Sequence, residues 1–228
     1  MFRLALTAVL LVGVSGNLIF RSLQNNNTPC FTKCVDNGNT ATYGKLFGNI
    51  DEICTSIAEA RDCVAKCNVP FNPFDMKTVR SICSEERRAD FKKHFVCYKE
   101  QIYATNERCN KMCGSIGKMV GDMRRTVAFL NKRECFNVSA LFDSMGEMCT
   151  TVKCYARCNR DSFNELCRQS DPTAGSFMQQ FHEDTLTAMN EDLNQFGMRN
   201  FMKGILPKEC HYMFNPAQLF NDHVFELE

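Results

Sequence analysis

Apolar residues recur at steps of three and four along two stretches of the chain, and this spacing places them on one face of a helix. The first stretch consists of Leu46, Ile50, Ile53, Ile57, Ala60, Val64 and Cys67. The second, longer stretch consists of Phe91, Phe95, Tyr98, Ile102, Cys109, Cys113, Ile116 and Val120. No run alternates apolar and polar residues over the length of a strand. The pattern therefore predicts an all-α fold.

A third helix is predicted near the C-terminus, with Asp171 as N-cap, Pro172 at the first helical position and an end at about Arg199. One broad side of it carries Phe177, Met178, Phe181, Met189, Leu193 and Phe196, opposite Glu183, Glu191 and Asn194. We expect this face to cover the rest of the protein. The alternative is a site for a lipid or another apolar ligand, because methionine adapts to irregular partners. Loops are expected at residues 36–39, 68–74, 131–139 and 204–216.

The first sixteen residues have the pattern of a secretory signal peptide. Arg3 precedes an apolar run from Leu4 to Val14, and small residues follow at Ser15 and Gly16. The run is shorter than the roughly 20 helical residues that span a bilayer, and no later segment reaches that length without charges. We therefore expect an exported, extracellular protein without a transmembrane anchor.

The chain has 228 residues, of which 15 are cysteine. Export favours disulfides for these residues, because the secretory pathway is oxidising. No Cys-x2-Cys pair is present, and both the thioredoxin motif and the common zinc-knuckle spacing need one. We expect no metal and no cofactor. The disulfide candidates are Cys30, Cys34, Cys54, Cys63, Cys67, Cys83, Cys97, Cys109, Cys113, Cys135, Cys149, Cys154, Cys158 and Cys167.

The order of these cysteines occurs twice, which predicts an internal duplication. A Cys-x3-Cys pair, a single cysteine, a second Cys-x3-Cys pair and another single cysteine follow one another from Cys30 to Cys83 and again from Cys109 to Cys167. Glu52-Ile53-Cys54-Thr55 also recurs as Glu147-Met148-Cys149-Thr150. We expect a signal peptide over residues 1–16, a cysteine-rich domain of two related helical-hairpin halves over residues 17–170, and a C-terminal helical extension over residues 171–228.

A spacing of four residues puts both sulfurs of a Cys-x3-Cys pair on one helix face. Two such helices packed antiparallel can form two rungs, for example Cys30–Cys67 with Cys34–Cys63, and Cys109–Cys158 with Cys113–Cys154. Cys54 and Cys149 lie on another flank of their helices and should bridge to a different element, with Cys83 and Cys167 as candidate partners. The sequence alone does not fix this connectivity.

Cys210 lies outside the repeated framework and is the odd cysteine. We expect a free thiol that could link two chains into a dimer, although pairing within the chain is also possible.

The charges are balanced, with 27 Lys and Arg against 26 Asp and Glu, so bulk electrostatics give no reason to expect a nucleic-acid partner. The basic cluster of Arg124, Arg125, Lys132 and Arg133 is interpreted as a solvated face, with contact to a sulfated glycan as the alternative. Asn26 and Asn137 begin N-glycosylation sequons in predicted loops.

The chain contains no Gly-x-Ser-x-Gly elbow, His-Glu-x-x-His zinc motif, phosphate loop or calcium-binding loop. His182-Glu183 begins like a zinc-protease motif, but Leu186 stands where the second histidine belongs. The other histidines, His94, His211 and His223, lie in unrelated contexts. We expect a protein that is not an enzyme and has no catalytic residues.

The framework resembles the cysteine-rich helical domain of the nematode chondroitin proteoglycan 4 type. The resemblance rests on the segments 30–34, 47–54, 60–67 and 81–83, on Cys97, and on the segments 109–113 and 154–158. It implies an extracellular, non-enzymatic protein associated with eggshell or another matrix. Glycosaminoglycan chains attach at Ser-Gly, and the only such dipeptide here, Ser15-Gly16, lies in the predicted signal peptide. The mature chain is therefore not expected to carry such a chain itself.

These observations together predict a secreted binding or structural protein whose partner is a matrix protein or a glycan. A carrier of apolar ligands is the second interpretation, and a secreted enzyme is the third.

Overall fold

The structure is a computed structural model that describes residues 29–31, 33–34, 49–69, 71–115 and 138–221. The described residues form helices and turns and include no strand, which confirms the predicted all-α fold. The chain divides into two compact units, residues 1–99 and residues 100–228. The predicted boundary at residue 170 stays a prediction.

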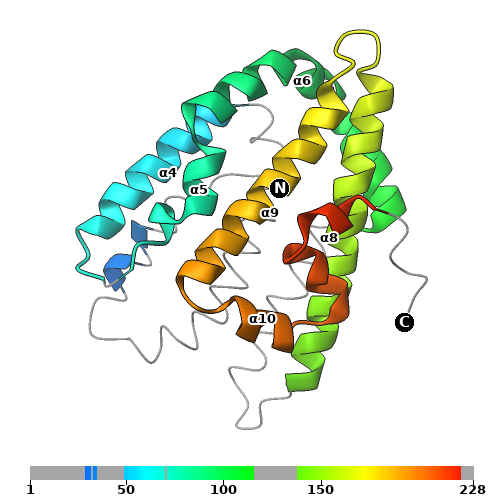
Figure 1. Ribbon diagram of the computed structural model, residues 1–228. Coiled ribbons are helices and arrows are strands. Elements are labelled where there is room, and N and C mark those ends of the chain that lie inside the picture. Colours follow the sequence, from blue (N-terminus) through cyan, green and yellow to red (C-terminus); the bar gives the residue numbers. More distant parts are fainter. Residues whose placement is uncertain (1–28, 32, 35–48, 70, 116–137, 222–228) are drawn as a thin grey trace. The chain divides into compact units, whose positions relative to one another are not determined.

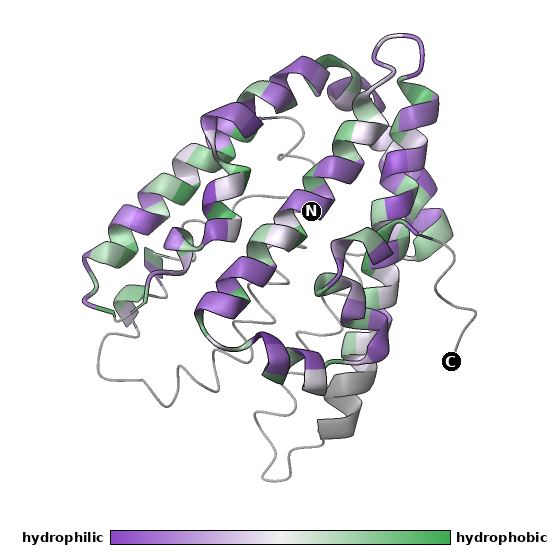
Figure 2. Ribbon diagram, viewed as in Figure 1, coloured by the Kyte–Doolittle hydropathy of each residue, from purple (hydrophilic) through white to green (hydrophobic). Residues whose placement is uncertain are grey.

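The first unit is built around α4 (Ile50–Ala65) (Figure 1). Asn49 caps this helix, because its Oδ1 accepts a hydrogen bond from the Glu52 backbone N–H at 3.2 Å. The predicted apolar face is buried as expected, with Ile50, Ile53, Ile57, Ala60 and Val64 inside, and apolar and polar residues alternate along the helix accordingly (Figure 2). The chain leaves α4 through Asn68, whose φ of 50° is left-handed.

Two short helices follow in the same unit, η1 (Pro73–Asp75) and α5 (Lys77–Ile82). Then α6 (Glu85–Cys113) begins behind Ser84, whose hydroxyl accepts from the Arg87 backbone N–H at 3.2 Å. The helix starts six residues before Phe91, where the predicted apolar stripe begins. It is followed by Gly114, whose φ is 81°. Within the first unit, Asp51 of α4 pairs with Lys92 at 2.8 Å, and this contact lowers the pKa of the Asp51 carboxyl.

The second unit contains the end of α6 and a pair of long antiparallel helices, α8 (Val138–Leu166) and α9 (Ala174–Gln195) (Figure 1). They approach closely at Gly175. A Cβ atom added there would lie 2.1 Å from Asn164 Oδ1 and 2.5 Å from the Arg160 carbonyl oxygen, both on α8. Only glycine therefore fits at this crossing.

The predicted bounds of the C-terminal helix, Asp171 to Arg199, are wrong at both ends. Asp171 lies ahead of α9, where its carboxylate accepts from the Thr173 backbone N–H at 3.2 Å. At the other end Gly197 has a φ of 64°, and the Met198 N–H bonds back to the Leu193 carbonyl at 2.8 Å while the Gly197 N–H bonds to Asn194 at 3.0 Å. This pair of bonds is a Schellman motif, which ends the helix.

The expected loop over residues 204–216 is mostly helical instead. After α10 (Arg199–Ile205) come two 3-10 helices, η2 (Lys208–Met213) and η3 (Pro216–Leu219). Their backbone is held by side chains of the long helices, since Asn190 donates to the Met213 carbonyl at 2.7 Å. We call residues 206–221 the C-terminal segment. Within the described residues, no helix is both long and apolar enough to cross a bilayer.

Candidate functional site

The first unit holds two disulfide rungs side by side. Residues 29–31 and 33–34 are helical and carry Cys30 and Cys34. Cys30 bonds to Cys67 in the turn that follows α4, and Cys34 bonds to Cys63 in the last turn of this helix. The Cα atoms of the two pairs are 5.7 Å and 5.6 Å apart. This confirms the predicted pairing and its basis, since residues four apart on each helix face the same way.

A third bridge in this unit joins Cys54 of α4 to Cys83, the residue that follows α5. The prediction that Cys54 bonds to a different element from Cys63 and Cys67 is confirmed, and so is its partner. Three covalent links therefore fix α4 to segments on either side of it in the sequence.

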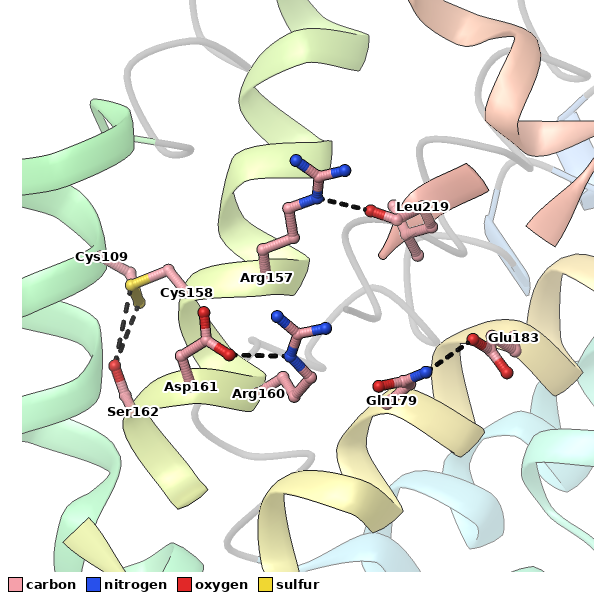
Figure 3. A network of polar contacts seen from close by, with 9 residues as sticks. All are labelled: Cys109, Arg157, Cys158, Arg160, Asp161, Ser162, Gln179, Glu183 and Leu219. Atoms are coloured by element: carbon pink, nitrogen blue, oxygen red, sulfur yellow. Dashed lines mark hydrogen bonds and ion pairs between the residues drawn. A yellow bond between two sulfur atoms is a disulfide. The ribbon is translucent and has the colours of Figure 1, made fainter. Parts of the chain in front are cut away.

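The second unit repeats the double rung. Cys109 and Cys113 at the end of α6 bond to Cys158 and Cys154 of α8, as predicted. Ser162, one helical turn beyond Cys158, places its hydroxyl oxygen 3.7 Å from the Cys158 sulfur and 3.9 Å from the Cys109 sulfur (Figure 3). The Cys109–Cys158 disulfide is thus flanked by a polar side chain.

The prediction that Cys149 bonds to a different element from Cys154 and Cys158 is confirmed, and Cys210 pairs within the chain, which was the alternative to a free thiol; the expected partner Cys167 and the expected free thiol at Cys210 are wrong. Cys149 bonds to Cys210 and not to Cys167, with their Cα atoms 5.0 Å apart. The physical reason is that η2 folds back against α8, which buries Cys210 completely beside the backbone of Met145. Cys210 is therefore neither a free thiol nor available to join two chains.

All fourteen cysteines of the described residues are disulfide-bonded, with Cys97 and Cys167 among them. Cys135 lies outside the described residues, as do the sequons at Asn26 and Asn137, the basic cluster of residues 124–133 and His223. The predicted signal peptide and its Ser15-Gly16 dipeptide lie outside them as well.

A groove of about 390 Å³ runs over the double rung of the second unit. It is lined by Arg108, Met112, Thr150, Lys153, Cys154, Arg157, Cys158, Asp161, Ser162 and Glu209. Its walls come from α6, α8 and η2. The disulfides form part of the lining, so the groove has a covalently fixed base. No sequence pattern indicated it, because its residues come from three separate elements.

Three cationic and two anionic side chains line the groove. Arg157 donates to the Leu219 carbonyl oxygen at 2.8 Å (Figure 3) and to the Asn221 carbonyl oxygen at 2.7 Å. Arg108 pairs with Glu165 at 2.6 Å, and Asp161 pairs with Arg160 at 2.7 Å. The lining therefore carries a small excess of positive charge.

The chain matches the model of the family described as Chondroitin proteoglycan 4 over residues 17–222. It belongs to the chondroitin proteoglycan 4 family. No curated protein and no solved structure matches it.

In this family member the described histidines do not line the groove. His182 is buried on α9, and its ring contacts the rings of Phe181 and Phe220. Its Nδ1 lies 2.7 Å from the Met178 carbonyl, and its Nε2 has no hydrogen-bond partner. Burial lowers its pKa to about 3, so the ring is neutral at physiological pH.

The apolar face of α9, predicted either to cover the protein or to bind an apolar ligand, is buried by packing. Met178, Phe181, Met189 and Leu193 are inside, and α9 packs against α8. Phe196, at the end of the helix, is 43% exposed. The first interpretation of this face agrees with its burial in this chondroitin proteoglycan 4 family member.

Proposed function

We propose that this protein is a secreted, non-enzymatic component of an extracellular matrix such as an eggshell. One observation carries the proposal: every cysteine of the described residues is in a disulfide. Disulfides of this density form and persist in the secretory pathway and outside the cell, and they are rare in the cytosol.

The bridges also suit a protein that must last outside the cell. Each one stabilises the fold by about 2 to 4 kcal/mol in the chain-entropy account, because it restricts the unfolded chain. A matrix component gains from such stability, since it is not replaced quickly.

The partner that suits the groove best is a sulfated glycan of the matrix. Arg108, Lys153 and Arg157 reach the groove from two helices that the disulfide rungs hold together. Arginine and lysine bind sulfate groups by charge-assisted hydrogen bonds.

Export is tested by expressing the full chain in secretory animal cells. We expect the protein in the medium, with Asn17 as its first residue. Retention inside the cells with reduced cysteines would contradict the proposal.

Glycan binding is tested by surface plasmon resonance with chondroitin sulfate and with the same polymer after desulfation. We expect binding that weakens as the salt concentration rises, because exposed charges are screened. Lys153→Gln should weaken it about twofold to fivefold. Lys203→Gln, a change at an exposed lysine of α10 outside the groove, is the control. Equal loss in the two variants would remove the groove from the proposal.

A further inference from the structure

Exposed apolar side chains gather at α10 in the second unit. Within the described residues, seven large apolar side chains are exposed, and three of them lie between positions 196 and 205. These three are Phe196, Phe201 and Ile205, at 43%, 61% and 36% exposure. Phe196 lies at the end of α9, and the other two lie on α10, which follows it directly (Figure 1). We call these three residues the α10 patch.

The exposure of the patch follows from how α10 packs. Met202 and Leu206 hold the inner side of the helix, at 2% and 5% exposure. Phe201 and Ile205 are four residues apart, so they share a face of the helix, and that face is in contact with water. Gly204 is exposed beside them, and a Cβ atom added there would meet nothing within 4 Å. A broad surface can therefore approach α10 closely from outside.

The charged side chains around the patch are all of one sign. The segment 193–208 contains Arg199, Lys203 and Lys208 and no acidic residue. Lys203 and Lys208 are exposed, and neither forms an ion pair within the part of the chain that the structure describes. The acidic residues on either side of the segment do not oppose them, since Asp192 is buried and Glu209 lines the groove. This surface therefore complements a partner that carries negative charge.

A lipid bilayer with anionic headgroups matches both properties of this surface. Aromatic and aliphatic side chains enter the boundary between headgroups and acyl chains, while neighbouring lysines keep their ammonium groups at the level of the headgroups. A second copy of the chain does not match, because a symmetric dimer would place the same positive charges opposite each other. We propose that the α10 patch binds the surface of a bilayer that contains anionic lipids. This contact is separate from the groove and does not depend on glycan binding.

The binding should be weak and reversible. Three partly exposed side chains bury much less apolar surface than an acyl anchor does. Attraction between the lysines and the headgroups adds to this contribution, and salt screens it. We therefore expect binding that rises with the share of anionic lipid and falls as the salt concentration rises.

Vesicle sedimentation of the full chain tests the proposal. We expect binding to vesicles of phosphatidylcholine and phosphatidylserine in equal amounts, and at least about tenfold weaker binding to phosphatidylcholine alone. Phe201→Ser should weaken binding to the mixed vesicles about fivefold, because it removes apolar surface from the patch. Tyr103→Ser, at an aromatic side chain of α6 that is 84% exposed, is the matched control and should bind as the native chain does. Equal loss in the two variants, or no binding to the mixed vesicles, would overturn the proposal.

Tryptophan fluorescence gives an independent readout, because the chain contains no tryptophan of its own. We expect the emission of Phe201→Trp to move to shorter wavelength when the mixed vesicles are added, since the indole ring enters the bilayer boundary. Tyr103→Trp should show no such change. Chondroitin sulfate in place of vesicles should leave both spectra unchanged. An unchanged spectrum of Phe201→Trp on the vesicles, or the same change with chondroitin sulfate, would refute insertion of this patch into a bilayer.

Discussion

His182 is a buried base with one ring nitrogen that has no partner. Its pKa of about 3 in the folded protein lies below the ordinary value of 6.5 because burial disfavours the charged ring. The unfolded chain therefore binds a proton that the folded chain excludes. Above pH 6.5 protonation of His182 does not reduce the free energy of unfolding. As the pH drops from 6.5 toward 3, protonation in the unfolded chain lowers that free energy progressively.

We predict that His182→Phe removes this dependence. Phenylalanine keeps an aromatic ring in contact with Phe181 and Phe220 and cannot take up a proton. Between pH 7 and pH 5 the native chain should lose about 2 kcal/mol more stability than the variant, which corresponds to about 1.4 kcal/mol per pH unit below the unfolded pKa. Urea unfolding of both proteins at each pH, with disulfides intact, measures the difference. An equal loss in the two proteins would show that other groups govern the acid response.

At the scale of elements, three glycines of the second unit have different roles. Gly175 allows α8 and α9 to approach, Gly197 ends α9 in a left-handed conformation, and Gly204 lies in α10 with nothing within 4 Å of an added Cβ. Alanine at these positions therefore tests contact and backbone conformation separately.

We predict that replacing these glycines by alanine changes the stability in opposite directions. Gly175→Ala should destabilise by about 1 to 3 kcal/mol, since the methyl group collides with the backbone and a side chain of α8. Gly197→Ala should cost about 1 kcal/mol because of its positive φ. Gly204→Ala should be neutral or stabilise by up to about 1 kcal/mol, as expected in an open helix. Thermal unfolding of the three variants gives the order, and destabilisation by Gly204→Ala would contradict this account.

The helices illustrate what local sequence can and cannot predict. The stripe of α4 was predictable because each buried residue depends only on its spacing from the last. The end of α9 was missed because the apolar stripe continues through Phe196, although Gly197 next to it carries the stop signal. The groove was not predictable, since it depends on how three elements meet.

At the scale of the whole molecule, some disulfides could be predicted from local spacing and others depend on the tertiary fold. Both double rungs follow from the four-residue spacing within a helix, so their pairing could be predicted. The bond from Cys149 to Cys210 spans 61 residues and depends on the fold of the C-terminal segment, which no local pattern encodes. Counting cysteines suggested that Cys210 was the odd one, and packing against α8 determined otherwise.

We predict that non-reducing peptide mapping of the full chain recovers Cys149 and Cys210 in one linked pair. The physical reason is that both sulfurs are buried where η2 meets α8. Cys210→Ser should leave the double rungs unchanged and lower the stability by about 2 to 4 kcal/mol. Recovery of Cys210 as an alkylated free thiol would contradict the structure.

The disulfide between Cys149 and Cys210 affects what proteolytic cleavage does to the protein. A protease that cuts the turn between α8 and α9 would leave two polypeptides still tied together by this sulfur bond. Such a nicked molecule would migrate as a single band until a reducing agent was added. Damage to the backbone at that exposed turn would thus not release the C-terminal part from its place.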